Sequence, residues 1–318
     1  MQPPKILARA VLAATLAGAG AVAAGAAPAQ AAGGTGLLTG IVRNDRGAVV
    51  ANAKISIWPT VNENANPVAV TTTSAAGAWR VPKLDAGRYK IEIGLAGWSE
   101  YAPGRERDYA DARTYRVATW GRTSVSSVVE RAGSFAGRLT TASGRPAAGV
   151  SVTVDDYRTA RAFQTTTSAT GRYSLPVPPG GDYVVSYRDG TFRQYAPHTV
   201  DQALARHYTV ASGQRVRVND RLLRAASLTG RLVDAAGAPV AGATVRFIYT
   251  ETAVELETTT DANGAYRFQK LNPGPIKVSF RTADGVGQYA YQAQSYDEAT
   301  EFRLSLSNRT VVDDALLP

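Results

Sequence analysis

The chain has 318 residues, of which 44% are hydrophobic and 19% are charged, and it contains no cysteine. Such a chain is too apolar for intrinsic disorder, and the lack of cysteine excludes a disulfide framework and a cysteine-ligated metal site. The formal charge is +9 at pH 7, and arginine dominates it, since only six of the 35 basic residues are lysine. The coding bias of a GC-rich gene explains this enrichment, and attraction to anionic wall polymers or acidic glycans is the functional alternative.

The N-terminal segment predicts a signal peptide over residues 1–31. Lys5 and Arg9 give it a basic start, an apolar run from 10 to 27 follows, and Ala29-Gln30-Ala31 offers a cleavage site. No later segment approaches the ~20 apolar residues of a membrane helix. We therefore expect a secreted, extracellular protein that has no membrane anchor after signal cleavage.

The remainder of the chain repeats one glycine pattern three times. In every copy the second glycine follows the first by seven residues, and the fourth follows the third by ten. The periods of 97 and 93 residues are long enough for each copy to be a small domain with its own core. We predict β-sandwich repeats at 37–132, 134–226 and 227–318. The glycines are Gly40, Gly47, Gly77 and Gly87, then Gly137, Gly144, Gly171 and Gly181, then Gly230, Gly237, Gly264 and Gly274.

The predicted elements follow the same order in every copy, and the first copy illustrates it. A strand over 38–43 leads to a turn at the second glycine, and apolar residues at 53, 55 and 57 then form the buried face of a strand. The threonine triplet at 71–73 favours a further strand, and two more follow around 89–93 and 125–129. Roughly six to seven short strands with turns about every 8–12 residues predict an all-β fold, an antiparallel Greek-key β-sandwich in each copy.

Two motifs of the third copy resemble the carboxypeptidase regulatory-like domain. They are Leu228–Asp234 followed by Gly237–Val245, and Thr260–Phe268 followed by Leu271–Gly274. All three copies keep the pattern, so the resemblance covers about residues 37 to 318. It implies the transthyretin-like, or prealbumin-like, carbohydrate-binding-like sandwich that accompanies many secreted enzymes and surface proteins. Because every matched residue is a turn or core position, the resemblance implies a fold and does not specify an activity.

Metal-binding residues are scarce, and we expect neither a metal site nor a cofactor. The only histidines, His198 and His207, both fall in the second copy, and we interpret them as surface residues. The turn Asp261–Gly264 is rich in oxygen atoms, but Tyr266 and Phe268 stand where a calcium loop would continue with carboxylates. We interpret it as a turn held by Asx hydrogen bonds.

The sequence offers no catalytic residue that we can name, and a non-catalytic protein is the preferred reading. Glycoside hydrolysis needs two carboxylates about 5–10 Å apart in a cleft. The adjacent pairs Asp155-Asp156 and Asp313-Asp314 do not recur across the copies, and we expect both to face water at strand ends. A polysaccharide hydrolase function, such as that of a secreted alpha-amylase, is supported only by the enzymes that such domains accompany.

Aromatic residues after the 89–93 strand and its equivalents are the candidate ligand-binding residues. Aromatic faces flanked by Gln, Glu and Arg suit sugar rings, which stack their C–H faces and form hydrogen bonds at their edges. The alternative is that these aromatic residues attach a long loop to the sandwich. Trp58 and Trp120 have no aromatic counterparts in the other copies and are freer to serve a site. The candidates are Trp98, Tyr101, Tyr195, Tyr289 and Tyr291.

The leading hypothesis is a secreted, non-catalytic array that binds carbohydrate or a cell-wall polymer, with several weak copies adding avidity. A structural spacer or stalk without a ligand is the second hypothesis, and an accessory part of a polysaccharide hydrolase is the third. Nucleic acid is not an expected partner, because this chain is expected to be exported and its sequence has no basic stripe with interleaved aromatic residues. The sequence leaves the oligomeric state open.

Overall fold

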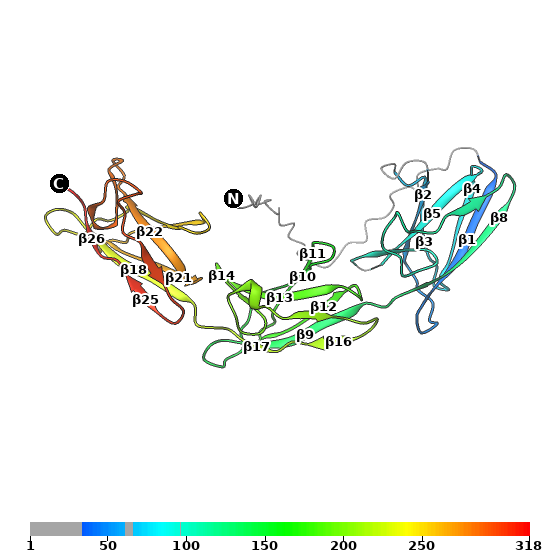
Figure 1. Cartoon of the computed structure of the whole chain (residues 1–318), viewed down its shortest axis with the longest axis horizontal. Helices are drawn as coiled ribbons and strands as arrows, with labels where there is room; N and C mark the ends of the chain where they lie inside the picture. Colours follow the sequence, from blue (N-terminus) through cyan, green and yellow to red (C-terminus); the bar gives the residue numbers. More distant parts are fainter. Residues whose placement is uncertain (1–33, 61–65, 96) are drawn as a thin grey trace, which may run out of the picture.

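The computed structural model describes residues 34–60, 66–95 and 97–318, so the expected signal peptide lies outside the described residues. The fold is all-β, as predicted, apart from two single-turn 3₁₀ helices (Figure 1). None of the described helices has the length and apolarity required to cross a membrane.

Three units of the same build follow one another along the chain (Figure 1). The first unit contains β1 (Gly36–Asn44), β2 (Lys54–Pro59), β3 (Ala69–Thr72), β4 (Ala78–Leu84), β5 (Gly87–Gly94), β6 (Ser99–Tyr101), β7 (Tyr115–Val117) and β8 (Arg122–Val129). The second contains β9 (Gly133–Thr140), β10 (Ser151–Asp156), β11 (Arg161–Thr166), β12 (Arg172–Val177), β13 (Asp182–Asp189), β14 (Phe192–Tyr195), η1 (Gln202–Leu204), β15 (His207–Thr209), β16 (Arg215–Arg217) and β17 (Asp220–Arg221). The third contains β18 (Ala226–Val233), β19 (Thr244–Tyr249), β20 (Glu255–Thr259), β21 (Ala265–Leu271), β22 (Gly274–Arg281), β23 (Gly287–Tyr289), η2 (Ala290–Gln292), β24 (Phe302–Leu304), β25 (Arg309–Val311) and β26 (Asp314–Ala315).

Each unit is a sandwich of two sheets with the same strand order. In the first unit one sheet has the order β4-β1-β8 and the other β3-β2-β5-β6, with β7 also paired to β5. The second and third units repeat this topology as β12-β9-β16 with β11-β10-β13-β14, and as β21-β18-β25 with β20-β19-β22-β23. The β-sandwich fold is therefore confirmed.

One pairing departs from the expected antiparallel pattern. The last strand of each unit runs parallel to the first, as β8 does along β1 over eight residue pairs, β16 along β9 and β25 along β18. Parallel first and last strands place the entry and the exit of the chain at opposite ends of a unit. This arrangement lets the units follow one another in a row.

The alternating apolar residues form three separate cores. Ile55, Ile57, Ile91 and Ile93 are fully buried in the first unit, and the equivalent positions of the other two units are buried as well. Each core contains residues of one unit only. Burial of one face of each strand is the physical cause of the alternation seen in the sequence.

The first glycine of each repeat lies where two backbones approach closely. A Cβ atom at Gly40, Gly137 or Gly230 would stand 2.1, 1.8 or 1.9 Å from a carbonyl oxygen of the parallel last strand. Those oxygens belong to Val125, Val218 and Val312. No side chain larger than that of glycine fits here without moving the strand.

The aromatic residue two positions after the third glycine packs at the same place. The hydroxyl of Tyr173 donates a hydrogen bond to the Val218 carbonyl (2.7 Å), and that of Tyr266 donates to Val312 (2.6 Å). At these carbonyls the last strand is divided into two short pieces, β16 and β17 or β25 and β26. The first unit has Trp79 instead, whose buried indole N–H has no partner among the described residues, and there β8 is continuous.

The third threonine of each triplet connects two backbone segments. Thr73, Thr167 and Thr260 are buried, and each accepts a 2.9 Å hydrogen bond from a main-chain N–H at the start of the second strand. Each also donates to a main-chain carbonyl at 2.6–2.7 Å. The triplets therefore combine strand residues with one buried bridging hydroxyl.

We expect Gly40→Ala to destabilise the first unit by about 2–3 kcal/mol, because the new methyl group overlaps a backbone carbonyl that belongs to the sheet. Gly47→Ala is the matched control, since that position has open space and only a positive φ of 82°, which costs about 1–2 kcal/mol. All four tryptophans lie in the first unit, so tryptophan fluorescence during urea unfolding reports the stability of that unit in both variants. Equal destabilisation by the two variants would contradict the close-approach argument.

Candidate functional site

The candidate aromatic residues lie in different units and differ in exposure. Trp98, in the connection between β5 and β6, and Tyr195, on β14, are each only 7% exposed. Tyr101 on β6 and Tyr289 on β23 are half-buried. Tyr291, in η2, is 56% exposed and has a left-handed backbone with φ 62°. The structure therefore does not bring the three repeated tyrosines, Tyr101, Tyr195 and Tyr289, into one surface.

The repeated tyrosines contact the loop that follows them. The Tyr101 ring meets Tyr109 edge-on at 6.0 Å, and the Tyr289 ring meets Tyr296 in the same way at 6.1 Å. The Tyr195 hydroxyl donates a 3.1 Å hydrogen bond to Gln202. Burial raises the pKa of Tyr101 to about 12. These contacts support the alternative in which the tyrosines attach the loop to the sandwich.

A buried polar residue precedes each of these tyrosines, and its hydrogen bonds are internal rather than available to the edge of a sugar. The Gln194 amide donates to Asp220 (3.2 Å) and to the Arg221 carbonyl (3.0 Å), and it accepts from the Leu223 N–H (2.7 Å). Gln288 repeats these bonds with the carboxylate of Asp314, the Ala315 carbonyl and the Leu317 N–H. This glutamine therefore attaches the end of the last strand to the neighbouring sheet.

The aspartate at the end of the last strand also holds the loop. Asp220 accepts from the His198 N–H at 3.0 Å, and Asp314 accepts from the Tyr291 N–H at 2.9 Å. Both loop residues have positive φ, 52° and 62°, so these hydrogen bonds fix a rarely populated backbone conformation. The exposure of Tyr291 follows from this anchored turn.

The first unit achieves the same attachment with a different pair of residues. Ser127 stands at the register position of Asp220 and Asp314, and Glu100 stands at that of the two glutamines. The Glu100 carboxylate accepts from the Arg105 N–H (2.9 Å) and from the Glu130 N–H (3.3 Å), and Arg105 has φ 72°. The carboxylate thus stands on β6 instead of on the last strand, and burial raises the pKa of Glu100.

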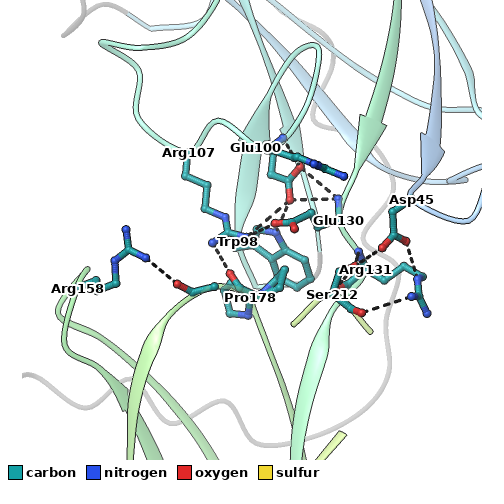
Figure 2. A network of polar contacts seen from close by, with 12 residues as sticks. Asp45, Trp98, Glu100, Arg107, Glu130, Arg131, Arg158, Pro178 and Ser212 are labelled. Atoms are coloured by element: carbon teal, nitrogen blue, oxygen red, sulfur yellow. Dashed lines mark hydrogen bonds and ion pairs between the residues drawn. The ribbon is translucent and has the colours of Figure 1, made fainter. Parts of the chain in front are cut away.

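Figure 2 shows the polar network where the first unit meets the second. Arg131, between β8 and β9, forms an ion pair with Asp45 (2.6 Å), and the Ser212 hydroxyl of the second unit donates to the same carboxylate at 2.5 Å. The hydrogen bonds from Arg131 and Ser212 lower the pKa of Asp45. Arg107 contacts the Glu130 carboxylate (2.9 Å) and donates to the carbonyl of Pro179 in the second unit. Asp45, Arg107, Glu130, Arg131, Pro179 and Ser212 are called the first joint.

The second joint links the β13–β14 hairpin of the second unit to the β21–β22 turn of the third. Lys270 forms an ion pair with Asp189 at 2.5 Å, and the Thr191 hydroxyl donates to the Lys270 carbonyl at 2.7 Å. The Asn272 side chain accepts from the Arg193 N–H and donates to the Arg193 carbonyl, both at 2.9 Å. Asp189, Thr191, Arg193, Lys270 and Asn272 define this joint.

Both joints share one backbone contact. The carbonyl of Arg131 accepts from the Gly213 N–H at 3.2 Å, and the carbonyl of Arg224 accepts from the Ser307 N–H at 2.8 Å. Each arginine lies in the connection between two units, and each N–H lies in the turn before the last strand of the following unit. The same linker-to-turn bond therefore recurs in chemically different joints.

The other candidates have ordinary partners. His207 contacts Asp182 at 2.8 Å, His198 contacts the Arg221 carbonyl at 2.8 Å, and both rings are half-exposed. The described residues contain no cluster of three or more potential metal ligands. Asp261 accepts from two N–H groups of its own turn, which agrees with the Asx interpretation.

The expectation that both acidic pairs face water is wrong for Asp156. This residue is buried, and its carboxylate accepts from the Arg158 N–H (3.0 Å) and the Thr159 hydroxyl (2.8 Å). Asp314 is half-buried because it serves the loop attachment described above. Two adjacent acids in a strand point to opposite faces, so one of them turns inward.

Trp120 is the most exposed of the large hydrophobic side chains in the described part of the chain, at 81%. It lies in the turn before β8, where its main-chain N–H donates to the Thr35 hydroxyl at 3.0 Å. A hollow of about 670 Å³ beside it is also lined by Arg80, Lys83 and Arg122. Trp58, in contrast, is half-buried and donates to Glu92 at 2.9 Å.

We expect Glu100→Gln to destabilise the first unit by about 1–3 kcal/mol, because one amide oxygen cannot serve all the donors around the carboxylate. The double variant Glu100→Gln/Ser127→Asp recreates the pair of the other units and should recover most of this loss. Ser127→Asp alone places two carboxylates together in a buried site and should be the worst of the three. Tryptophan fluorescence during unfolding gives the free energy of unfolding of the three variants and the wild type. If the losses of the two single variants add in the double variant, the two carboxylate positions are not interchangeable and the argument is contradicted.

A model of the carboxypeptidase regulatory-like domain matches residues 134–222 and 227–313, which together make up more than half of the chain. No match was found among curated proteins. Among solved structures, the chain is similar to the Bacillus anthracis TIE protein, with 15% identity, a TM-score of 0.26, and coverage of 89% of this chain and 50% of that one. It thus spans about half the length of that protein.

Two pilins from streptococci are also similar. The Streptococcal ancillary pilin has 12% identity and a TM-score of 0.33, with 89% of this chain and 99% of that chain covered. GBS52, the minor pilin of Streptococcus agalactiae, has 13% identity and a TM-score of 0.35, with 58% and 97% covered. The family model confirms the resemblance for the second and third repeats and does not match the first. The chain belongs to the carboxypeptidase regulatory-like domain family.

Proposed function

We propose that this chain is a non-catalytic extracellular protein of structural or adhesin-like character, in which three sandwiches form a semi-rigid array. The observation that carries the proposal is the pair of joints. Each combines an ion pair, side-chain hydrogen bonds to the backbone of the next unit and the same linker-to-turn bond. Joints of this kind oppose free rotation of the units.

The short connections support the same conclusion. Three residues separate β8 of the first unit from β9 of the second. Four residues separate β17 of the second unit from β18 of the third. Neither connection is a glycine- and serine-rich segment of the kind that behaves as a flexible coil. With parallel first and last strands, each unit extends the array in the direction of the chain. A spacer that holds its ends apart is the simplest use of this geometry.

Binding of carbohydrate or a cell-wall polymer is a second candidate function, and Trp120 is the observation that favours it. An indole with 81% exposure next to arginine side chains offers a stacking face and hydrogen-bond donors, which is the combination that sugars require. Tyr291 is the remaining candidate with an exposed ring. Trp98, Tyr101, Tyr195 and Tyr289 are less accessible, and the three tyrosines contact the loop that follows them.

We expect Asp45→Ala to widen the range of angles between the first two units, because it removes the partner of both Arg131 and Ser212. Small-angle X-ray scattering of the purified protein should then give a broader distribution of maximum dimensions. Asp85→Ala is the matched control, since Asp85 is exposed and lies outside the joints. A wild-type protein as flexible as the Asp45 variant would contradict the array proposal.

We expect Trp120→Ala to weaken retention on one of starch, chitin, cellulose or cell-wall sacculi by about five- to tenfold, since stacking on an exposed ring contributes roughly 1 kcal/mol. Retention should persist at high salt, because stacking is not screened as charge pairing is. Tyr291→Ala is the comparison variant. If both variants keep the retention of the wild type, the aromatic site is wrong, and the structural role still stands.

A further inference from the structure

Four arginines and no acid line a hollow on the outer face of one sheet in the second unit. In β9 the core side is occupied by Phe135 and Leu139, so Arg138 points outward. Arg172 on β12 lies directly opposite Arg138 in the antiparallel pair. Arg215 and Arg217 are the two exposed residues of β16, on the other side of β9. Three neighbouring strands therefore present their guanidinium groups on one surface, the arginine groove: Arg138, Arg172, Arg215 and Arg217.

These arginines lack the partners that would normally balance them. Like charges directly opposite on neighbouring strands, as at Arg138 and Arg172, are destabilising. Within the described ranges, none of the four guanidinium groups lies within 4 Å of a carboxylate, and none donates a hydrogen bond to another residue. Elsewhere in the chain, Arg107, Arg131 and Arg246 all form ion pairs. The four charges of the groove are therefore available to an external anion.

The surface between the arginines is hollowed. A depression of about 280 Å³ is lined by all four of them, together with Gly137 and the polar side chain of Asn219. Its floor is the small-residue stretch of β9, where Ala136 and Gly137 leave the sheet low between the flanking strands. A shallow depression bordered by long cationic side chains fits an extended chain better than a compact molecule.

The third unit shows that this groove is not a property of the fold. There the equivalent hollow contains Arg231 and Arg309 at the positions of Arg138 and Arg215. Val311 replaces Arg217 and Ala265 replaces Arg172, while Arg267 is a third arginine of that hollow. Asp313 replaces Asn219 and accepts a 2.8 Å hydrogen bond from the Arg231 main-chain N–H, as Asn219 does from that of Arg138 at 2.9 Å. The hollow of the second unit is therefore smaller than that of the third, about 280 Å³ against 640 Å³. It is lined by four arginines in place of three, and by a neutral amide in place of Asp313.

We propose that the arginine groove binds an acidic polysaccharide whose sugar units carry carboxylate groups. The guanidinium plane matches a carboxylate with two parallel hydrogen bonds, and the four forks allow several repeating carboxylates to be held at once. Cross-strand neighbours about 5 Å apart and residues about 7 Å apart along β16 provide a regular array of donors. None of the four arginines belongs to either joint, so this proposal does not rest on the array function and fails separately from it.

The test measures binding of the purified protein to polygalacturonate at low salt, with fully methyl-esterified polygalacturonate as the uncharged equivalent. We expect binding to the acid form alone, and Arg215→Gln/Arg217→Gln should weaken it about tenfold or more. Arg145→Gln/Arg161→Gln is the matched control, because it removes the same charge from exposed positions of the same unit. The control variant should lose less than about threefold.

Asn219→Asp is a second variant that removes no arginine. It places at position 219 the acid that the third unit has at Asp313. The new carboxylate can still accept from the Arg138 N–H, as Asp313 accepts from that of Arg231. We expect it to fold normally, as judged by circular dichroism, and to weaken polygalacturonate binding severalfold. Equal losses in the groove and control variants would overturn the proposal, because net charge alone would then explain binding. Binding of polyphosphate but not of polygalacturonate, or equal binding of the methyl ester, would also overturn it.

Discussion

Each sandwich depends on a close approach between the backbone of its first strand and that of its last. Glycine at positions 40, 137 and 230 leaves room for the carbonyl of a parallel strand, and a Cβ atom there would lie within about 2 Å of that oxygen. The aromatic residue of the fourth strand covers the same carbonyl, and in two units its hydroxyl donates a hydrogen bond to it. Because this contact joins the two ends of a unit, it also sets the direction in which the chain leaves.

The exit direction links the fold of one unit to the architecture of the chain. Parallel first and last strands require the chain to enter and leave at opposite ends, so successive units follow in a row rather than folding back. The hydrogen bonds that attach the loops also fix the position at which the chain leaves a unit. Gln194 and Gln288 hold the end of the last strand, and Glu100 does so in the first unit by accepting from Glu130 of the first joint. The end of the last strand therefore serves both the attachment of the loop within a unit and the direction of the chain toward the next unit.

The repeats also show how one fold permits different surfaces. Core and turn positions recur because packing and backbone geometry restrict them in every copy. The outward positions of the same sheet are free to vary, and they carry Trp120 with Arg122 in the first unit and four arginines in the second, whereas the third adds Asp313. This separation is why family membership, which rests on core and turns, does not specify a ligand.

The amino-acid sequence was enough to predict the elements and the fold class, because glycine turns and alternating apolar residues are local consequences of backbone geometry and burial. It also contained the repeated Gln-Tyr and Glu-Tyr pairs, but whether these faced a ligand or the protein depended on strand pairing across some thirty residues. Only the tertiary structure placed Glu100 opposite Ser127, buried Asp156, and brought Asp45 to Arg131 and Ser212. It likewise gathered Arg138, Arg172, Arg215 and Arg217 on one face, since residues up to 79 positions apart become neighbours only when their strands pair.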